Sequence, residues 1–179
     1  MNQIKSIWIL TGYKLFAAGG PNALKVEVIS RQVKKSKSSF YHLFGDLEMF
    51  TGQLLNYHLK RAKIIAEKER QCRNVVPELL HVILEMKEDL LFNRQLRIHR
   101  NNEGFKNCFE KASQEVGEAI VGIWADELNL KGNSKLAHMV LNLAIENFYL
   151  QITPETLNYE WLVNYVNDLK LMVKEFEHI

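Results

Sequence analysis

The stretch Val26–Phe50, VEVISRQVKKSKSSFYHLFGDLEMF, decides the fold because it has the pattern of two short helices joined by a tight turn. Apolar residues recur at helical spacing up to Val33, and Ser36 then offers a side chain suited to cap a second helix. Lysines occupy the turn, and hydroxyl side chains occupy the second helix. A helix, a short turn and a helix rich in hydroxyls and lysine are typical of a helix-turn-helix.

A further helix is expected before this pair, over residues 3–18, because apolar residues recur there at helical spacing and Gly19-Gly20 follows. The paired helices are expected at 25–33 and 36–43. The residues expected along the apolar face of the first helix are Ile4, Ile7, Trp8, Thr11, Leu15 and Ala18. The residues expected to form the core of this three-helix module are Phe16, Ile29, Phe40 and Phe44.

Positive charge is concentrated in this module. The chain carries a net charge of +2, but its first 44 residues hold seven basic residues against a single acid, Glu27. The remainder of the chain is therefore acidic by four charges. This asymmetry favours a basic N-terminal module that meets a polyanion such as DNA, although charge alone is equally compatible with a solvated basic face.

Beyond the module the pattern predicts only helices. Apolar spacing indicates a long helix over 47–70, and the further helices are expected at 77–92, 103–129, 135–150 and 157–176. The stretch 93–102 has a basic and broken pattern. The expected fold class is therefore all-α with about nine helices. A three-helix domain is expected at 1–46, followed by a helical body at 47–179.

The last two of these helices are apolar on almost every side. A helix that is apolar all round must be buried all round, so we expect one side to face the subunit core and the other a second subunit. The prediction is a homodimer that forms a four-helix bundle, and the alternative is that both helices lie at the centre of a monomer. The residues expected at the interface are Met139, Leu143, Trp161, Tyr165, Leu169 and Met172.

A set of residues in the N-terminal part of the chain forms a recognisable pattern: Leu15-Phe16, Gly20, Ile29, Ser36, Ser39, Phe40, Tyr41 and Phe44. With this pattern, the N-terminal part of the chain resembles the DNA-binding domain of the TetR family of transcriptional regulators. The resemblance implies that the hydroxyls of Ser39 and Tyr41 contact DNA phosphates. It also implies that Lys37, Ser38 and His42 meet base edges or nearby phosphates. The candidate DNA-binding residues are Lys25, Lys34, Lys35, Ser36, Lys37, Ser38, Ser39, Tyr41 and His42.

Three positions depart from the family pattern. Val33-Lys34-Lys35 stands where the family commonly has Ala-Gly-Val, and a non-glycine residue at positive φ costs about 1 kcal/mol, so a turn of different shape is expected. Lys34 and Lys35 would then add phosphate contacts. Lys25 replaces the usual hydroxyl cap of the first paired helix, and Leu47 replaces a lysine that often reaches a phosphate. These departures keep open an alternative, a helical ligand-binding or interaction module whose DNA binding is weakened or lost.

The resemblance implies that the function is that of a ligand-responsive transcriptional regulator, usually a repressor. A dimer would bind double-stranded DNA at a near-palindromic operator, and residues 47–179 would bind a small-molecule effector of apolar or aromatic character. The candidate effector-binding residues are Tyr57, His81, Leu84, Phe105, Phe109, Trp124 and Phe148. For each of them plain core packing is the competing interpretation.

The sequence offers little support for an enzyme. Two Glu-x-x-His spacings, Glu78 with His81 and Glu175 with His178, resemble half of a di-iron bundle site, but supporting glutamates have no obvious inward position. Cys72 and Cys108 lack the spacing of a metal site, so reduced cysteines and no cofactor or metal are expected. No apolar run approaches the roughly 20 residues that cross a bilayer, and a cytoplasmic location is expected.

Overall fold

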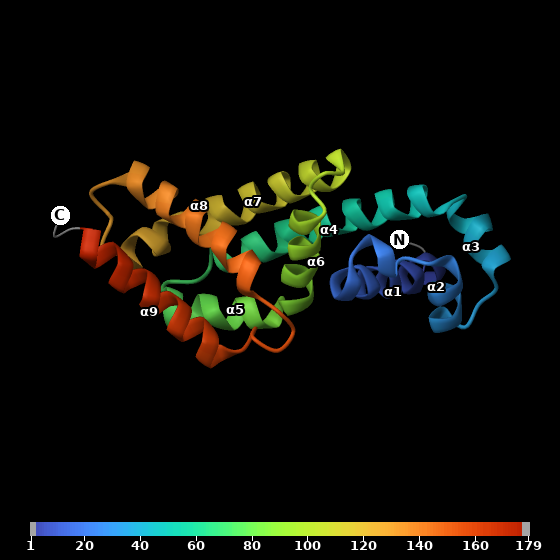
Figure 1. Cartoon of the computed structure of the whole chain (residues 1–179), viewed down its shortest axis with the longest axis horizontal. Coiled ribbons are helices and arrows are strands. Elements are labelled where there is room, and N and C mark those ends of the chain that lie inside the picture. The colour runs from blue at the N-terminus through green and yellow to red at the C-terminus, as the bar shows by residue number, and fades with distance from the viewer. Residues whose placement is uncertain (1–2, 177–179) are drawn as a thin grey trace. The chain divides into compact units, whose positions relative to one another are not determined.

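The computed structural model describes residues 3–176, and within that range the chain is helical without strands (Figure 1). The all-α prediction is therefore confirmed. None of the described helices is both long enough and apolar enough to cross a membrane. The elements in chain order are α1 Gln3–Gly19, the 3-10 turn η1 Pro21–Ala23, α2 Val26–Val33, α3 Lys37–Phe44, α4 Leu47–Glu69, the irregular turn η2 Val75–Leu79, α5 Leu80–Glu85, α6 Lys87–Ile98, α7 Glu103–Glu127, α8 Ser134–Gln151 and α9 Tyr159–Phe176.

The chain packs as two compact units. The first unit comprises the residues up to Arg61 together with Glu88–Ala112, and the second comprises Ala62–Lys87 together with the residues from Ser113 onward. The unit boundaries thus fall inside α4 and α7, whereas the sequence suggested a boundary after residue 46. The expected division into a three-helix domain at 1–46 and a helical body at 47–179 stays a prediction.

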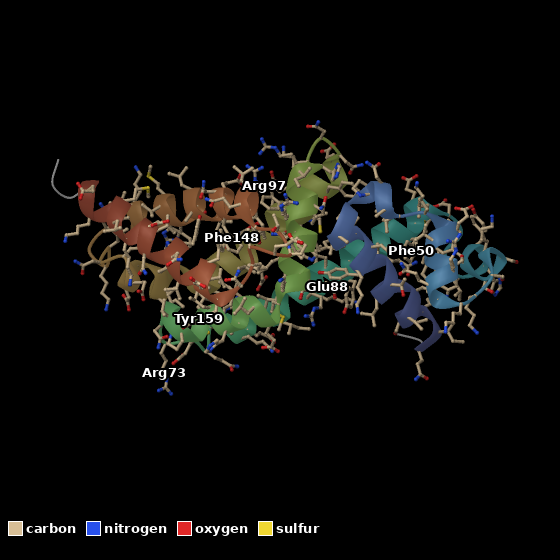
Figure 2. The ribbon with its side chains drawn as sticks, turned by 60° about the horizontal axis from the view of Figure 1, so that its bottom comes forward. Phe50, Arg73, Glu88, Arg97, Phe148 and Tyr159 are labelled. Carbon is tan, nitrogen blue, oxygen red and sulfur yellow. The ribbon has the colours of Figure 1, made fainter. Side chains whose placement is uncertain are left out.

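Aromatic side chains form the centre of the first unit. Phe16, Phe40 and Phe44, three of the four expected core residues, are buried, and so is the fourth, Ile29. The Phe50 ring of α4 lies among the N-terminal helices (Figure 2), with its centroid 5.1 Å from the ring of Phe40 and 4.8 Å from that of Phe44. The start of α4 is therefore part of the same core as the helix-turn-helix.

The buried face of α1 differs from the expected one. Ile4 and Ile7 are 57% and 49% exposed, whereas the residues that α1 buries are Trp8, Ile9, Gly12, Tyr13, Phe16 and Ala17. Gly12 explains the shift, because a Cβ added there would lie 2.4 Å from Cζ of Phe50. The absence of a side chain at this position lets α1 pack closely on α4, and a search for large apolar residues misses such a face.

The helix expected at 77–92 is two helices. The break falls at Met86, whose backbone (φ −99°, ψ 22°) ends α5, and α6 then continues through Ile98. The stretch 93–102, expected to be broken, is thus helical over its first half. The sequence pattern was misleading because α6 buries polar residues, Asp89, Asn93 and Gln95, at positions where apolar residues mark a helix face.

In the second unit α9 packs beside α5 (Figure 1). The Tyr165 hydroxyl of α9 donates a hydrogen bond of 2.6 Å to the carbonyl oxygen of Ala144 in α8. Lys87 donates from its ammonium to the carbonyl oxygens of Pro154 and Leu157, and so ties the start of α6 to the connection before α9. The first bond holds α9 against α8, and the other two hold the connection between these helices against Lys87.

Candidate functional site

The N-terminus of α3 is held by a serine cap. The Ser36 hydroxyl accepts a hydrogen bond of 3.1 Å from the backbone N–H of Ser39 and lies 2.9 Å from the Ser39 hydroxyl. One of the N–H groups that a helix start leaves without a helical partner is thereby satisfied. The cap expected from the sequence is therefore confirmed.

The turn between α2 and α3 keeps a left-handed residue although no glycine is present. Lys34 has φ 57° and ψ 44°, and its N–H donates to the carbonyl of Arg31, while the N–H of Lys35 donates 3.0 Å to the carbonyl of Ser30. The expectation of a differently shaped turn is therefore wrong. The hydrogen bonds that close the end of α2 hold Lys34 in a conformation that its Cβ disfavours.

The side chains expected to meet DNA lie on the outside of this unit. Tyr41 is 51% exposed while its ring contacts that of Phe40 edge-on, with centroids 5.6 Å apart. Phe40 and Phe44 of the same helix point into the core. Ser39 is half-buried, and the exposed candidates are Lys25, Lys34, Lys35, Ser36, Lys37, Ser38, Tyr41 and His42. Helix α3 thus presents a polar and basic face and buries an aromatic one.

One candidate is already paired. The Lys37 ammonium lies 3.2 Å from a carboxylate oxygen of Glu27 in the first turn of α2, and both side chains are exposed. A hydrogen bond from its own backbone N–H, followed by the bond from Lys37, lowers the pKa of the Glu27 carboxyl. Glu27 is therefore charged at neutral pH, beside the start of α3.

The departures at Lys25 and Leu47 are visible in the structure. Lys25 occupies the N-cap of α2 in an extended conformation and makes no side-chain cap hydrogen bond. At the start of α4 the Asp46 carboxylate caps the backbone N–H of Met49 at 2.7 Å. Leu47 lies half-buried beside that cap. Lys25 therefore lacks the hydroxyl that the family pattern has at its position, and Leu47 lacks the ammonium that the pattern has at its position.

The effector-binding candidates divide between the two units. Tyr57, Phe105 and Phe109 belong to the first unit, where Phe105 and Phe109 are buried and Tyr57 packs edge-on against Tyr13. The candidates in the second unit are His81, Leu84, Trp124 and Phe148. A groove of about 1010 Å³ in the first unit is lined by the start of α4 and by Pro21, Leu24, Asp46, Asn102, Gly104 and Phe105. Phe105 is the one effector-binding candidate that lines it.

The second unit contains buried polar atoms without a hydrogen-bond partner. They are Nε1 of Trp124, Oγ of Ser113 and Oε2 of Glu69. Burial raises the pKa of the Glu69 carboxyl to about 8, so this side chain is largely protonated at neutral pH. Buried polar groups are normally hydrogen-bonded, so these three atoms stand out inside the second unit.

Aromatic contacts occur at the remaining candidates of the second unit. The His81 ring of α5 stacks on Tyr159 of α9, with ring centroids 5.4 Å apart. Phe148 of α8, labelled in Figure 2, takes part in further ring contacts. Its ring centroid lies 5.9 Å from that of Trp161 and 5.8 Å from that of Tyr165. Both residues therefore take part in the packing between helices of this unit.

The expected interface residues on α8 and α9 differ in exposure. Met139, Leu143 and Met172 are 54%, 67% and 40% exposed, while Trp161 and Tyr165 are half-buried. Leu169 is buried inside the unit, so it has no surface to offer a second subunit. Further large apolar side chains exposed on these helices, which the sequence prediction omitted, are Leu136, Leu150, Tyr159 and Leu171.

A polar network inside the first unit was not anticipated. The Tyr13 hydroxyl donates 2.8 Å to Oδ1 of Asp89 and lies 2.7 Å from Nδ1 of His58, while Arg61 donates to both carboxylate oxygens of Asp89 at 2.9 and 2.8 Å. Nε2 of His58 lies 3.2 Å from Oδ1 of Asn93. The network joins α1, α4 and α6. Tyr13 is 45 positions from His58 and 76 positions from Asp89, so no regular spacing in the sequence reveals these partners.

Burial dominates the acid–base chemistry of this network. It lowers the pKa of His58 to about 4, so the ring is neutral at physiological pH. Burial, and then the charge of Asp89, raise the pKa of Tyr13 well above its usual value. The hydrogen bonds to Asp89 raise the pKa of Arg61. At neutral pH the network therefore contains one ion pair and two neutral rings.

The di-iron hypothesis finds no complete ligand set. The Glu78 carboxylate accepts hydrogen bonds from the backbone N–H of Arg73 and from the side chain of Asn74, and His81 stacks on Tyr159. His178 lies outside the described residues. Among the residues that the structure describes, no group of three or more His, Cys, Asp or Glu side chains is arranged to hold a metal ion.

Comparisons with known proteins identify the fold. No family model and no curated protein sequence matches the chain. Two crystal structures, both provisionally described as TetR-family transcriptional regulators, match 97% of the chain over 95% of their own length. The protein from Rhodococcus sp. has 17% sequence identity and a TM-score of 0.57, and the protein from Mesorhizobium loti has 14% identity and a TM-score of 0.58. The resemblance inferred from the sequence is thus confirmed at the level of the fold.

Proposed function

Because the chain has the fold of TetR-family regulators, we propose that it is a DNA-binding transcriptional regulator that acts as a homodimer. The observation that carries the proposal is the two-sided character of α3. Phe40 and Phe44 anchor the helix in the core, while Lys37, Ser38 and Tyr41 stand exposed on its other side. A recognition helix needs this arrangement, because only side chains that project from the protein surface can reach base edges and phosphates.

Electrostatics support the same surface. Six surplus positive charges in the first 44 residues would neutralise phosphates and release the cations bound around DNA. The hydroxyls of Ser39 and Tyr41 and the N–H groups at the start of α3 would fix the helix on phosphates, and Lys37, Ser38 and His42 would approach base edges or nearby phosphates. Residues 1–46 would therefore carry the DNA contacts.

Exposed apolar side chains support the dimer. Of the fourteen large apolar side chains that the described residues leave exposed, seven lie on α8 and α9. Leu136, Met139, Leu143 and Leu150 recur at helical spacing along one side of α8. Such a stripe would be covered by the same stripe of a second copy in a four-helix bundle, which would present two helix-turn-helix modules to an operator with two half-sites.

The effector would be a small molecule of apolar or aromatic character that binds within residues 47–179, and the regulator would act as a repressor. The buried, unpartnered atoms of Trp124, Ser113 and Glu69 support this part of the proposal, because each would offer an effector a polar contact inside the second unit. An effector that binds one spacing of the two modules more tightly would shift the dimer towards or away from the DNA-binding geometry.

The proposal is tested by DNA binding of three variants, Lys37→Ala, Ser39→Ala and Tyr41→Phe. Each should weaken binding to a duplex that the wild-type protein selects from random sequences, because each removes a charge or hydroxyl from the docking surface. Lys106→Ala on α7, which removes an equally exposed lysine, is the control and should bind as the wild type does. Normal DNA binding by all three variants would show that α3 is not the docking surface.

A second candidate, a helical interaction module without DNA binding, is favoured by Lys25 and Leu47. The cap of α2 lacks a hydroxyl, and α4 begins with a leucine where a cation would reach a phosphate. The same assay separates the two functions. A folded dimer that selects no sequence from random duplexes would favour the module, and selection of a defined sequence would favour the regulator.

A further inference from the structure

The ion pair between Glu27 and Lys37 lies on the face that would meet DNA. Glu27 is the only acid among the first 44 residues, and its carboxylate oxygen lies 3.2 Å from the ammonium of Lys37. The two side chains are 60% and 56% exposed, so the pair contributes little to stability. A single acid in an otherwise basic module, placed against the first residue of α3, calls for a role other than folding.

The carboxylate changes which acceptors the lysine can meet. An ammonium has three donors, so Lys37 can keep its bond to Glu27 and still donate to another acceptor. A phosphate bound to Lys37 would bring a second negative charge within a few ångströms of Glu27, and the two anions would repel each other. A base-edge acceptor, such as O6 or N7 of guanine, is uncharged and meets no such repulsion.

We propose that Glu27 makes Lys37 a reader of base edges rather than a phosphate contact, and thereby raises the sequence selectivity of DNA binding. The inference rests on the proposed function and names the specificity-determining pair within its site. Glu27 is a positioning residue here, since it acts on DNA through Lys37. Glu27 lowers the affinity for DNA in general, but it leaves the affinity unchanged for sites that offer a base-edge acceptor to Lys37.

The local structure suits this role. Glu27 stands in the first turn of α2 and Lys37 in the first turn of α3, so the pair bridges the two helices of the motif across the turn. The Glu27 carboxyl is ionised at neutral pH, since its own backbone N–H and Lys37 both favour the charged form. Lys25 also lowers the pKa of the Glu27 carboxyl, but it contributes less than Lys37 does.

The test compares Glu27→Gln with a matched control. Glu110 on α7 pairs with Lys106 across 3.9 Å, and those side chains are 58% and 57% exposed, so Glu110→Gln removes the same charge from a similar pair elsewhere. Binding of the full-length protein is measured on the duplex that the wild type selects and on a scrambled duplex of equal length and composition, at several salt concentrations. Thermal unfolding of both variants should match the wild type.

The expected result is a loss of selectivity in Glu27→Gln alone. Its affinity for the scrambled duplex should rise about tenfold at low salt, and the slope of log K against log salt should steepen by about 0.9 per protomer, because Lys37 then neutralises a phosphate. The preference for the selected duplex should fall about tenfold if affinity for that duplex stays nearly constant. In a Lys37→Met background, Glu27→Gln should leave the preference unchanged.

Each other outcome overturns the inference. Equal effects of Glu27→Gln and Glu110→Gln would mean that only net charge matters. If Glu27→Gln still lowered the preference for the selected duplex in the Lys37→Met background, Glu27 would repel DNA directly and not through the lysine. A wild-type protein that selects no duplex would overturn the proposed function as well, and this result is distinguishable because it appears before any variant is measured.

Discussion

At the scale of single residues, the most constrained group is Asp89. Its carboxylate is 4% exposed, and Arg61 donates to both of its oxygens while Tyr13 donates a third hydrogen bond. A buried charge without such partners would be strongly unfavourable, whereas a bidentate guanidinium pair compensates the lost hydration. The network therefore specifies how α1, α4 and α6 meet in the first unit. Removal of any one member should lower the stability of the protein, because it leaves a buried polar or charged group without its partner.

The buried His58 ring makes the stability of the protein depend on pH in the acidic range. The folded pKa of about 4 lies below the usual 6.5, so the unfolded chain binds more protons between these values and stability is lost as the pH falls through this window. Wild type should lose roughly 2 kcal/mol relative to His58→Gln between pH 7 and pH 5. Urea unfolding at both pH values measures the difference. A gap between the two proteins that does not change with pH would show that His58 is not buried in its neutral form.

Glu69 should act in the opposite direction. Its folded pKa of about 8 lies above the usual 4.5, so the unfolded chain releases its proton first and stability is lost as the pH rises through this window. Glu69→Gln should therefore gain roughly 3 kcal/mol over the wild type at pH 7 and little at pH 4. Urea unfolding of the pair across this range provides the measurement, and equal stabilities at pH 7 would mean that the carboxyl is solvated.

Some of these residues could be predicted from the sequence and some could not. Ser36 was recognisable as a cap because capping is local, and its partner Ser39 is three positions away. Tyr13 and Asp89 are 76 positions apart, and nothing in their spacing links them. Glu27 was visible as the single acid of a basic module, but its pairing with Lys37 depends on how the turn brings α2 and α3 together.

At the scale of elements, local sequence patterns predicted the ends of helices well where a capping residue or a glycine was present. The turn between α2 and α3 shows the limit of such rules. A lysine in place of glycine suggested a different turn, yet Lys34 adopts the left-handed conformation because the N–H groups of Lys34 and Lys35 close the end of α2. Tertiary and capping interactions overrode the preference of one residue.

Lys34→Gly should therefore stabilise the protein. Glycine has no Cβ to clash at φ 57°, so the free energy of unfolding should rise by about 1 kcal/mol, reduced by the greater freedom of glycine in the unfolded chain. Chemical denaturation of the variant and the wild type measures the change. Lys35→Gly is the control and should not stabilise, because among non-glycine residues the structure gives positive φ to Lys34 and Asn129 only in the part it describes.

The faces of helices were harder to predict than their ends. The large apolar residues of α1 suggested a face through Ile4 and Ile7, but Gly12 allows Phe50 to approach and rotates the buried face. In α6 the buried residues Asp89 and Asn93 concealed a helix, because polar side chains that are satisfied inside a protein carry no apolar pattern. Both errors arise from contacts that a periodicity search does not weigh.

At the scale of the whole molecule, the exposed stripe on α8 is the feature that a single chain leaves unexplained. Leu143 is 67% exposed at the centre of that stripe, and apolar patches of this kind mark interfaces. Its burial was expected from the all-round apolar character of the helix. The structure adds which side chains form the stripe, since Leu169 packs inward whereas Leu143 does not.

Leu143→Asp should convert the proposed dimer into a monomer. A charge at the centre of a buried apolar interface has no partner, and two copies would place two carboxylates close together across the symmetry axis. Analytical ultracentrifugation should give a mass near 21 kDa for the variant and about twice that for the wild type, whose chain is 20.9 kDa. Lys131→Asp, an exposed change outside α8, should leave the mass unaltered. A dimeric Leu143→Asp variant would place the interface elsewhere.

The measurement that tests the central claim most directly is binding of the purified protein to the DNA upstream of its own coding sequence, across a range of salt. A basic module whose α3 enters the major groove predicts tight, sequence-selective binding that falls steeply as salt rises, because phosphate contacts release bound cations. Binding that ignores sequence, or no binding by a folded dimer to either this DNA or a random pool, would contradict the regulator and favour a module that no longer reads DNA.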